Sequence, residues 1–294
     1  MNTSIESPLG IIGYPIGHSI SPVFQQAALD YLKINAEYRA YEVNPGDVGR
    51  FVDSLRSESV YGINVTVPHK EAVIAHLDEI DDWAAEAGAV NTIVNRNGRL
   101  AGYNTDGYGF LRALRESGGL EPAGKNALIL GAGGSARGVV QALLRADIAS
   151  LAIANRTLAR AQSLADMARS RGVPAEAMPL DSAQINDAAH SADLIVNCTS
   201  LGMTHGPDEG ASPLRADQIP PAALVYDLVY NPALTPLFRE AGQVGTATLG
   251  GITMLVYQGA ASFEIWLERP APVVVMMDAA MGAMREREQE ERSR

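Results

Sequence analysis

Residues 128–138 read LILGAGGSARG, an apolar run that ends in a glycine-rich turn and continues into a helix-like segment. Gly131, Gly133 and Ala136 occupy the small-residue positions of a G-x-G-x-x-G/A pattern. The first glycine permits a tight turn, the second lets a pyrophosphate approach the backbone, and the small third residue lets helix and strand pack closely. Because strand, turn, helix and next strand follow in order, this stretch predicts a parallel sheet that binds a dinucleotide.

The same α/β alternation extends on both sides of this stretch, over 8–105 and again over 126–251. Asn97-Gly98 joins two β-like runs and predicts a hairpin, whereas 70–88 is predicted as a helix. The whole pattern predicts an α/β protein of two domains. We expect an N-terminal α/β domain with a mostly parallel sheet over 1–106, to which the final helices of 252–294 return, and a Rossmann-type domain over 107–251.

The composition excludes several classes of protein. The 294 residues are 47% hydrophobic and 19% charged, which is enough apolar surface to exclude intrinsic disorder as the main state. A net charge of −11 argues against a nucleic-acid partner. The one cysteine, Cys198, fits a reducing compartment, and no Cys/His cluster has metal-ligand spacing. The late apolar stretch is too short to span a bilayer, so we expect a soluble protein. From the cysteine and histidine pattern we expect a cytoplasmic protein without a metal.

The end of the strand SLAIAN, residues 150–155, indicates which dinucleotide is bound. An NAD site carries Asp or Glu at this point to hold the ribose 2′-hydroxyl, but here Asn155 is followed by Arg156, with Arg160 one turn later. Two guanidinium groups are suited to a 2′-phosphate, so the sequence favours NADP. The alternative is that both arginines belong to an ordinary exposed helix face.

Two serines precede the first predicted helix. Ser19 and Ser21 lie two residues apart, on one side of an extended segment, and Pro22 follows at a helix start. Hydroxyl groups beside a helix N-terminus can bind a carboxylate. The alternative is that Ser21 only caps this helix, with Pro22 at its first position.

The motifs NVTVPHK, AVNT and NTDG supply further polar side chains, namely Asn64, Thr66, Lys70, Asn91 and Asp106. Lys70 is one of only three lysines, and burial can lower the pKa of a lysine until it exchanges protons near neutrality. Composition alone still favours an ordinary surface lysine. An Asp in N-T-D-G is by itself more typical of a turn or a helix cap.

Taken together, the motifs resemble the shikimate dehydrogenase family. YPIGHSISP, NVTVPHK, AVNT, NTDG, GAGGSARG, NRT, NCTSLGM, DLVYNPALTPL and GGITMLVYQGAASFEIW occur in the family's order over about 10–266. The resemblance implies NADP-dependent interconversion of 3-dehydroshikimate and shikimate, in the biosynthesis of aromatic amino acids. It also implies a small-molecule substrate.

The resemblance assigns roles to individual residues. It implies Lys70 and Asp106 as the catalytic pair, and it implies substrate contacts by Ser19, Ser21, Thr66, Asn91, Tyr230 and Gln258. Together with the glycine-rich turn, it predicts that NADP is held by Gly131, Ala132, Gly133, Gly134, Ser135, Ala136, Asn155, Arg156, Thr157, Arg160, Thr199, Gly251 and Met254. Met254 and Gln258 are four residues apart on a predicted helix and share a face, although a methionine at that spacing is usually part of a core.

Two alternatives remain at this stage. A quinate or broad quinate/shikimate dehydrogenase would share the fold, but Ser21 and Arg156 resemble the shikimate type. A non-catalytic NADP-binding protein would be free to lose Lys70 or Asp106, and both are present. Whether the protein is a monomer or a homodimer is left open by the sequence.

Overall fold

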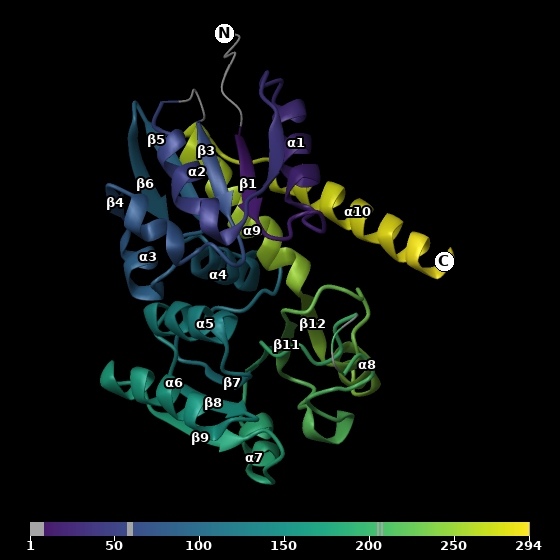
Figure 1. The fold of residues 1–294 in the computed structure, drawn as a ribbon. Helices are drawn as coiled ribbons and strands as arrows, with labels where there is room; N and C mark the ends of the chain where they lie inside the picture. Colours follow the sequence, from purple (N-terminus) through teal and green to yellow (C-terminus); the bar gives the residue numbers. More distant parts are fainter. Residues whose placement is uncertain (1–8, 58–60, 205, 207, 294) are drawn as a thin grey trace. The chain divides into compact units, whose positions relative to one another are not determined.

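The computed structural model describes residues 9–57, 61–204, 206 and 208–293. The chain forms two compact units, one of Met1–Gly109 with Leu255–Arg294 and the other of Phe110–Met254. Each unit is built on its own six-stranded sheet with helices packed against it, so the protein is an α/β protein. Figure 1 shows the elements in sequence colours.

The first unit contains a mixed sheet with strand order β2-β1-β3-β5-β6-β4. Its strands are β1 (Leu9–Gly13), β2 (Tyr38–Glu42), β3 (Gly62–Val65), β4 (Glu79–Ile80), β5 (Thr92–Arg96) and β6 (Arg99–Tyr103). Its helices are α1 (Ser21–Tyr31), α2 (Val48–Ser54), α3 (Asp82–Ala87) and α10 (Val273–Ser293), together with the start of α4 (Asp106–Glu116) and most of α9 (Gly251–Leu267).

The sheet changes from parallel to antiparallel at β5, and this change places the polar motifs. β1 pairs in parallel with both β2 and β3, so the chain leaves β1 and β3 at the same edge. β5 and β6 form the predicted antiparallel hairpin, in which Asn97 and Gly98 adopt positive φ angles of 56° and 86°. Asn91 directly precedes β5, and 104–106 directly follow β6, so these two motifs lie side by side.

The expectation of a helix over 70–88 is wrong. The segment contains a short 3₁₀ helix at Ala72–His76, then β4, and only then α3. The interruption is stabilised by Asp78, whose carboxylate accepts a hydrogen bond from the Leu100 amide at 2.7 Å and from Arg56. These contacts need Arg56 and β6 beside the segment, so a helical pattern within the segment does not contain them.

Two helices from the end of the chain complete this unit. α10, yellow in Figure 1, lies against the purple α1, although the two are about 250 residues apart in sequence. α9 is apolar on most of its surface and buries Val256, Phe263 and Trp266. The indole of Trp266 donates a hydrogen bond to the Ile93 carbonyl at 3.0 Å, which ties α9 to the hairpin.

The second unit is a doubly wound parallel sheet. The strands are β7 (Asn126–Leu130), β8 (Ser150–Asn155), β9 (Ala175–Pro179), β10 (Leu194–Asn197), β11 (Leu224–Asp227) and β12 (Ala247–Gly250). They lie in the order β12-β11-β10-β7-β8-β9, and every pairing is parallel. The helices are α5 (Gly134–Arg145), α6 (Leu158–Ser170), α7 (Gln184–His190) and α8 (Pro236–Gln243). This is the Rossmann strand order, with the reversal between β7 and β10.

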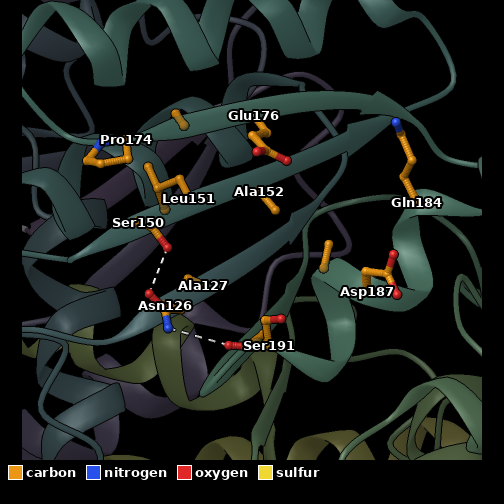
Figure 2. Close-up of a pocket in the computed structure, with 13 residues that line it drawn as sticks. Asn126, Ala127, Ser150, Leu151, Ala152, Pro174, Glu176, Gln184, Asp187 and Ser191 are labelled. Carbon is orange, nitrogen blue, oxygen red and sulfur yellow. Dashed lines mark hydrogen bonds between the residues drawn. The ribbon is translucent and has the colours of Figure 1, made fainter.

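A cavity of about 470 Å³ lies at the opposite end of this sheet from the glycine-rich turn. Figure 2 shows that it is lined by Asn126, Ser150 and Pro174, at the amino ends of β7, β8 and β9, and by Asp187 of α7. Ligands of such sheets bind outside the carboxyl ends of the strands. This cavity is therefore separate from the predicted dinucleotide site.

Candidate active site

Lys70 and Asp106 form an ion pair. The Lys70 Nζ donates a hydrogen bond to Asp106 Oδ2 at 2.6 Å, and the two side chains are 29% and 27% exposed. Lys70 lies in the loop after β3, where its carbonyl accepts a hydrogen bond from the Val90 amide at 2.8 Å. Asp106 is the first residue of α4. Two groups that are 36 residues apart in sequence thus meet while both side chains remain partly exposed to solvent.

The carboxylate of Asp106 has a second, fixed partner. Asn91 is 2% exposed, and its Oδ1 accepts a hydrogen bond from the Thr105 amide at 2.9 Å. Because a backbone N–H can only donate, this contact fixes the orientation of the Asn91 side chain. The Asn91 Nδ2 then donates to Asp106 Oδ1 at 2.8 Å. Asp106 therefore accepts from an ammonium group on one oxygen and from an amide on the other.

The sequence analysis gave a turn or a helix cap as the alternative role of Asp106. In the structure the side chain that contacts the main chain at this turn is that of Asn104. Asn104 Oδ1 accepts a hydrogen bond from the Asp106 amide at 3.0 Å, two residues later, as in an Asx turn that leads into α4. The Asp106 side chain makes its contacts with Lys70 and Asn91 instead.

Gln258 approaches the same cluster from α9. Its Oε1 lies 3.3 Å from Asn91 Nδ2 and 3.4 Å from the Thr105 hydroxyl. This approach depends on Gly109, because a Cβ added there would lie 2.5 Å from the Gln258 backbone nitrogen. Thr105, which is 3% exposed, is a member of this cluster that the sequence did not indicate as a site residue. Its place in the N-T-D-G motif is the signal that could have identified it.

The serine segment lies just before α1. The Ser19 Oγ accepts a hydrogen bond from the Ser21 amide at 3.2 Å, and α1 begins at Ser21, which is 4% exposed. The interpretation of Ser21 as a simple helix cap is wrong, because the N-cap position is Ile20 and no side chain caps the helix. Arg287 of α10 donates a hydrogen bond to the His18 carbonyl at 2.7 Å and so supports this segment.

Thr66 directly follows β3, in the loop that also carries Lys70. Its amide donates to the Ile12 carbonyl at 2.9 Å, which extends the pairing between β1 and β3 by one residue. Its side chain is half-buried. Thr66 thus belongs to the edge at which the chain leaves the parallel strands.

The glycine-rich turn of the second unit has the geometry that close backbone approach requires. Gly131 has a φ of +105°, and a Cβ there would lie 3.0 Å from the Cys198 backbone. An added Cβ on Gly133 or Gly134 would meet nothing within 4 Å, so the start of α5 is open. Ala136 is fully buried, as expected for the small residue at which helix and strand pack. Ser135, in the first turn of α5, is exposed.

The end of β8 is joined to this turn. Asn155 Oδ1 accepts a hydrogen bond from the Ala132 amide at 3.1 Å, and its Nδ2 donates to the Thr157 carbonyl at 2.9 Å. Arg156 and Arg160 are exposed, and within the residues that the structure describes neither forms an ion pair with a carboxylate. Two unpaired cations therefore lie where an NAD site would present an acid.

A polar cluster lies at the carboxyl ends of β10 and β11. Thr199 donates its hydroxyl proton to Asn197 Oδ1 at 2.7 Å, and Asn197 Nδ2 donates to Asp227 Oδ1 at 2.9 Å. Burial raises the pKa of the Asp227 carboxyl. Burial, with the neighbouring Asp227 charge, raises the pKa of the Cys198 thiol. A thiol of raised pKa is a poor nucleophile, which agrees with the interpretation of Cys198 as a small packed residue.

The remaining predicted residues lie at the end of this sheet. Tyr230 is 39% exposed and follows β11 by three residues. Gly251 begins α9 directly after β12, and a Cβ there would lie 2.3 Å from the Leu228 carbonyl oxygen, so only glycine fits. Met254, in the first turn of α9, is half-buried.

Comparison with known proteins identifies the chain's relatives. Family models described as the shikimate dehydrogenase substrate binding domain, shikimate / quinate 5-dehydrogenase and the shikimate 5'-dehydrogenase C-terminal domain match residues 11–93, 114–204 and 251–281. A curated relative from Symbiobacterium thermophilum, named shikimate dehydrogenase (NADP(+)), is 47% identical over 279 residues, which is 94% of each chain.

Solved structures agree with this result. The shikimate 5-dehydrogenase of Thermus thermophilus, in complex with NADP(H) and shikimate, has a TM-score of 0.82 at 37% identity and covers 94% of this chain and 99% of its own. The shikimate 5-dehydrogenase of Listeria monocytogenes, in complex with shikimate and NAD, has a TM-score of 0.87 at 33% identity and covers 92% and 95%. The relatives span nearly the whole chain, and the protein belongs to the shikimate dehydrogenase family.

Proposed function

We propose that the protein is an NADP-dependent shikimate dehydrogenase that reversibly reduces 3-dehydroshikimate to shikimate. The observation that carries the proposal is the contact of 2.6 Å between Lys70 Nζ and Asp106 Oδ2, in a partly exposed cluster of polar side chains. The names of the relatives support the same reaction and cofactor. The first unit would bind the substrate, and the second unit would bind NADP.

Reduction of a ketone adds a hydride to carbon and a proton to oxygen. NADPH, when bound, supplies the hydride, so the chain's own residues have to supply the proton and stabilise the developing negative charge. Lys70 is suited to both tasks, because its ammonium group has three N–H donors and only one is directed at Asp106. In the oxidation of shikimate the same pair accepts the proton. A close pair exchanges protons as a unit, so we assign the transfer to Lys70 and Asp106 together.

The other polar residues of the first unit fit a small hydroxylated acid. Ser19 and Ser21 would hold its carboxylate, because they offer hydroxyl donors beside the N-terminus of α1. Thr66, Asn91 and Gln258 would hydrogen-bond its ring hydroxyls. Tyr230 is proposed as a further contact with the substrate.

The residues of the second unit fit a phosphorylated dinucleotide. The turn from Gly131 to Ala136 has a positive φ at its first glycine and open space at Gly133 and Gly134, as close approach of a pyrophosphate requires. Asn155, Arg156, Thr157 and Arg160 would hold the adenosine end, with the two guanidinium groups on the 2′-phosphate. Thr199, Gly251 and Met254 would contact the nicotinamide end.

The direct test is absorbance at the nicotinamide band. Purified protein with shikimate should reduce NADP, and the values of kcat/KM for shikimate and quinate, each with NADP and with NAD, should be highest for shikimate with NADP. Higher values for quinate would support a quinate dehydrogenase instead. Tight binding of NADP without turnover would support a non-catalytic NADP-binding protein.

Arg156→Ala should weaken NADP binding while leaving NAD nearly unchanged. A lost charge-assisted contact with phosphate corresponds to about 1.5 to 3 kcal/mol, or about a 10- to 100-fold higher Kd for NADP. Calorimetry with both dinucleotides measures this effect directly. Arg239→Ala is the matched control, because it removes an exposed charge of the same unit, on α8. Equal losses for NADP and NAD would contradict the assignment of Arg156 to the 2′-phosphate.

The proposal also covers the cellular location and the assembly of the protein. Among the described residues, no helix is long and apolar enough to cross a bilayer. The lone cysteine is compatible with a reducing compartment, and we propose the cytoplasm. The proposed assembly is a monomer or a homodimer, which light scattering of the purified protein distinguishes.

A further inference from the structure

Asn64 is a buried polar residue for which the proposed reaction has no direct use. It lies on β3, is 4% exposed, and makes four side-chain hydrogen bonds. The two N–H groups of its Nδ2 are shared among three acceptors, the Asn91 carbonyl at 3.1 Å, the Ser262 hydroxyl at 2.9 Å and the Thr92 hydroxyl at 3.2 Å. Its Oδ1 accepts from the Tyr38 hydroxyl at 2.7 Å. One side chain thus joins β2, β3, β5 and α9.

The direction of these hydrogen bonds is fixed. The Asn91 carbonyl can only accept, so the Nδ2 of Asn64 must face it and the Oδ1 must face Tyr38. Tyr38 therefore has to donate. Tyr38 is 4% exposed, and the centroid of its ring lies 6.2 Å from that of Trp266. Burial raises the pKa of its phenol, so the phenol keeps the proton that it donates.

The same directional pattern continues to the catalytic pair. Thr92 accepts from Asn64 and donates its hydroxyl proton to Asn91 Oδ1 at 2.9 Å. Together with the Thr105 amide, this contact leaves the Nδ2 of Asn91 directed at Asp106. A series of donors thus runs from Tyr38 through Asn64, Thr92 and Asn91 to the carboxylate that accepts from Lys70.

We propose that Asn64, held by Tyr38, is a positioning residue of the active site. It acts by fixing the main chain and the side-chain orientation of Asn91, so that Asp106 meets an N–H on one oxygen and Lys70 on the other. The inference rests on the proposed function, because it concerns the pair that would exchange the proton with the substrate. Catalysis requires such groups to be held closely, and displacement by about 1 Å can cost about 100-fold in rate.

The test compares Asn64→Leu, Tyr38→Phe and the double variant in the full-length protein, after turnover of shikimate by the wild type has been measured. Asn64→Leu should lower kcat about 10- to 100-fold. Tyr38→Phe removes one oxygen atom and should lower kcat about two- to tenfold, the equivalent of one hydrogen bond. Because Tyr38 acts only through Asn64, the double variant should match Asn64→Leu within about twofold.

Two further measurements separate positioning from general loss of structure. The solvent deuterium isotope effect on kcat should rise in both single variants, since proton transfer becomes more limiting when the pair is displaced. The Kd for NADP should not change, because the residues proposed to hold NADP belong to the other unit. Tyr41→Phe is the matched control, since it removes a phenol from the same strand whose hydrogen bond is with the exposed Arg39.

The outcomes distinguish this inference from the proposed function. If the wild type turns over shikimate, but kcat and the isotope effect of Tyr38→Phe equal those of Tyr41→Phe, the positioning role is excluded while the function stands. That comparison also decides the matter if Asn64→Leu does not fold. Additive losses in the double variant would likewise overturn the inference. A wild type without turnover contradicts the proposed function itself.

Discussion

Lys70→Ala is expected to lower kcat about 10²- to 10⁴-fold while changing the KM for shikimate far less. The ammonium group is the donor nearest to Asp106, and it would stabilise the oxygen as negative charge develops and take part in moving the proton. These interactions are stronger in the transition state than in the bound substrate. Their loss therefore appears in kcat rather than in KM.

The control for this variant is Lys125→Ala. Lys125 also forms an ion pair with an aspartate, Asp193, at 3.3 Å, but its side chain is 46% exposed and it directly precedes β7. Its removal should leave kcat and KM within about twofold, because exposed ion pairs contribute little. A rise in KM at constant kcat in Lys70→Ala would mean that Lys70 only binds the substrate.

Asp106→Asn is expected to lower kcat by a similar factor, about 10²- to 10⁴-fold. The substitution keeps the shape of the side chain, but one carboxylate oxygen becomes an NH₂ group. That group would then face either the Lys70 ammonium or the Asn91 amide, both of which donate. Lys70 then loses its anionic partner. The ion pair that would exchange the proton with the substrate no longer exists.

Steady-state kinetics of Asp106→Asn should be compared with those of Asp193→Asn, in which the carboxylate paired with Lys125 is replaced in the same way. The fold at position 106 should be preserved, because the local hydrogen bond at the start of α4 joins the Asn104 side chain to the Asp106 amide and does not use the Asp106 side chain. An unchanged urea midpoint would verify this. Normal kcat in Asp106→Asn would rule out the ion pair as the proton-transferring group.

The sequence was most informative where structure is decided by neighbouring residues. The Asn97-Gly98 turn formed because both residues tolerate a positive φ, and the Gly131 turn follows a strand and opens a helix as its pattern predicts. The region 70–88 behaved differently. Its local pattern is helical, but contacts of Asp78 with Leu100 and Arg56 stabilise an interruption that no pattern within the region contains.

The candidate site shows the same division. The sequence by itself determined the α/β class, the glycine-rich turn and the absence of an acid after β8, and the order of its motifs indicated the family. Only the tertiary structure decided that Lys70 Nζ and Asp106 Oδ2 lie 2.6 Å apart, that the Asp106 side chain also contacts Asn91, and that Tyr38 and Asn64 are hydrogen-bonded to each other and to the Asn91 main chain. Turns and helix starts depend on the φ and ψ preferences of adjacent residues. A hydrogen-bond network among β2, β3, β5 and α9 depends on how the sheet is paired, and that pairing brings together residues that are far apart in sequence.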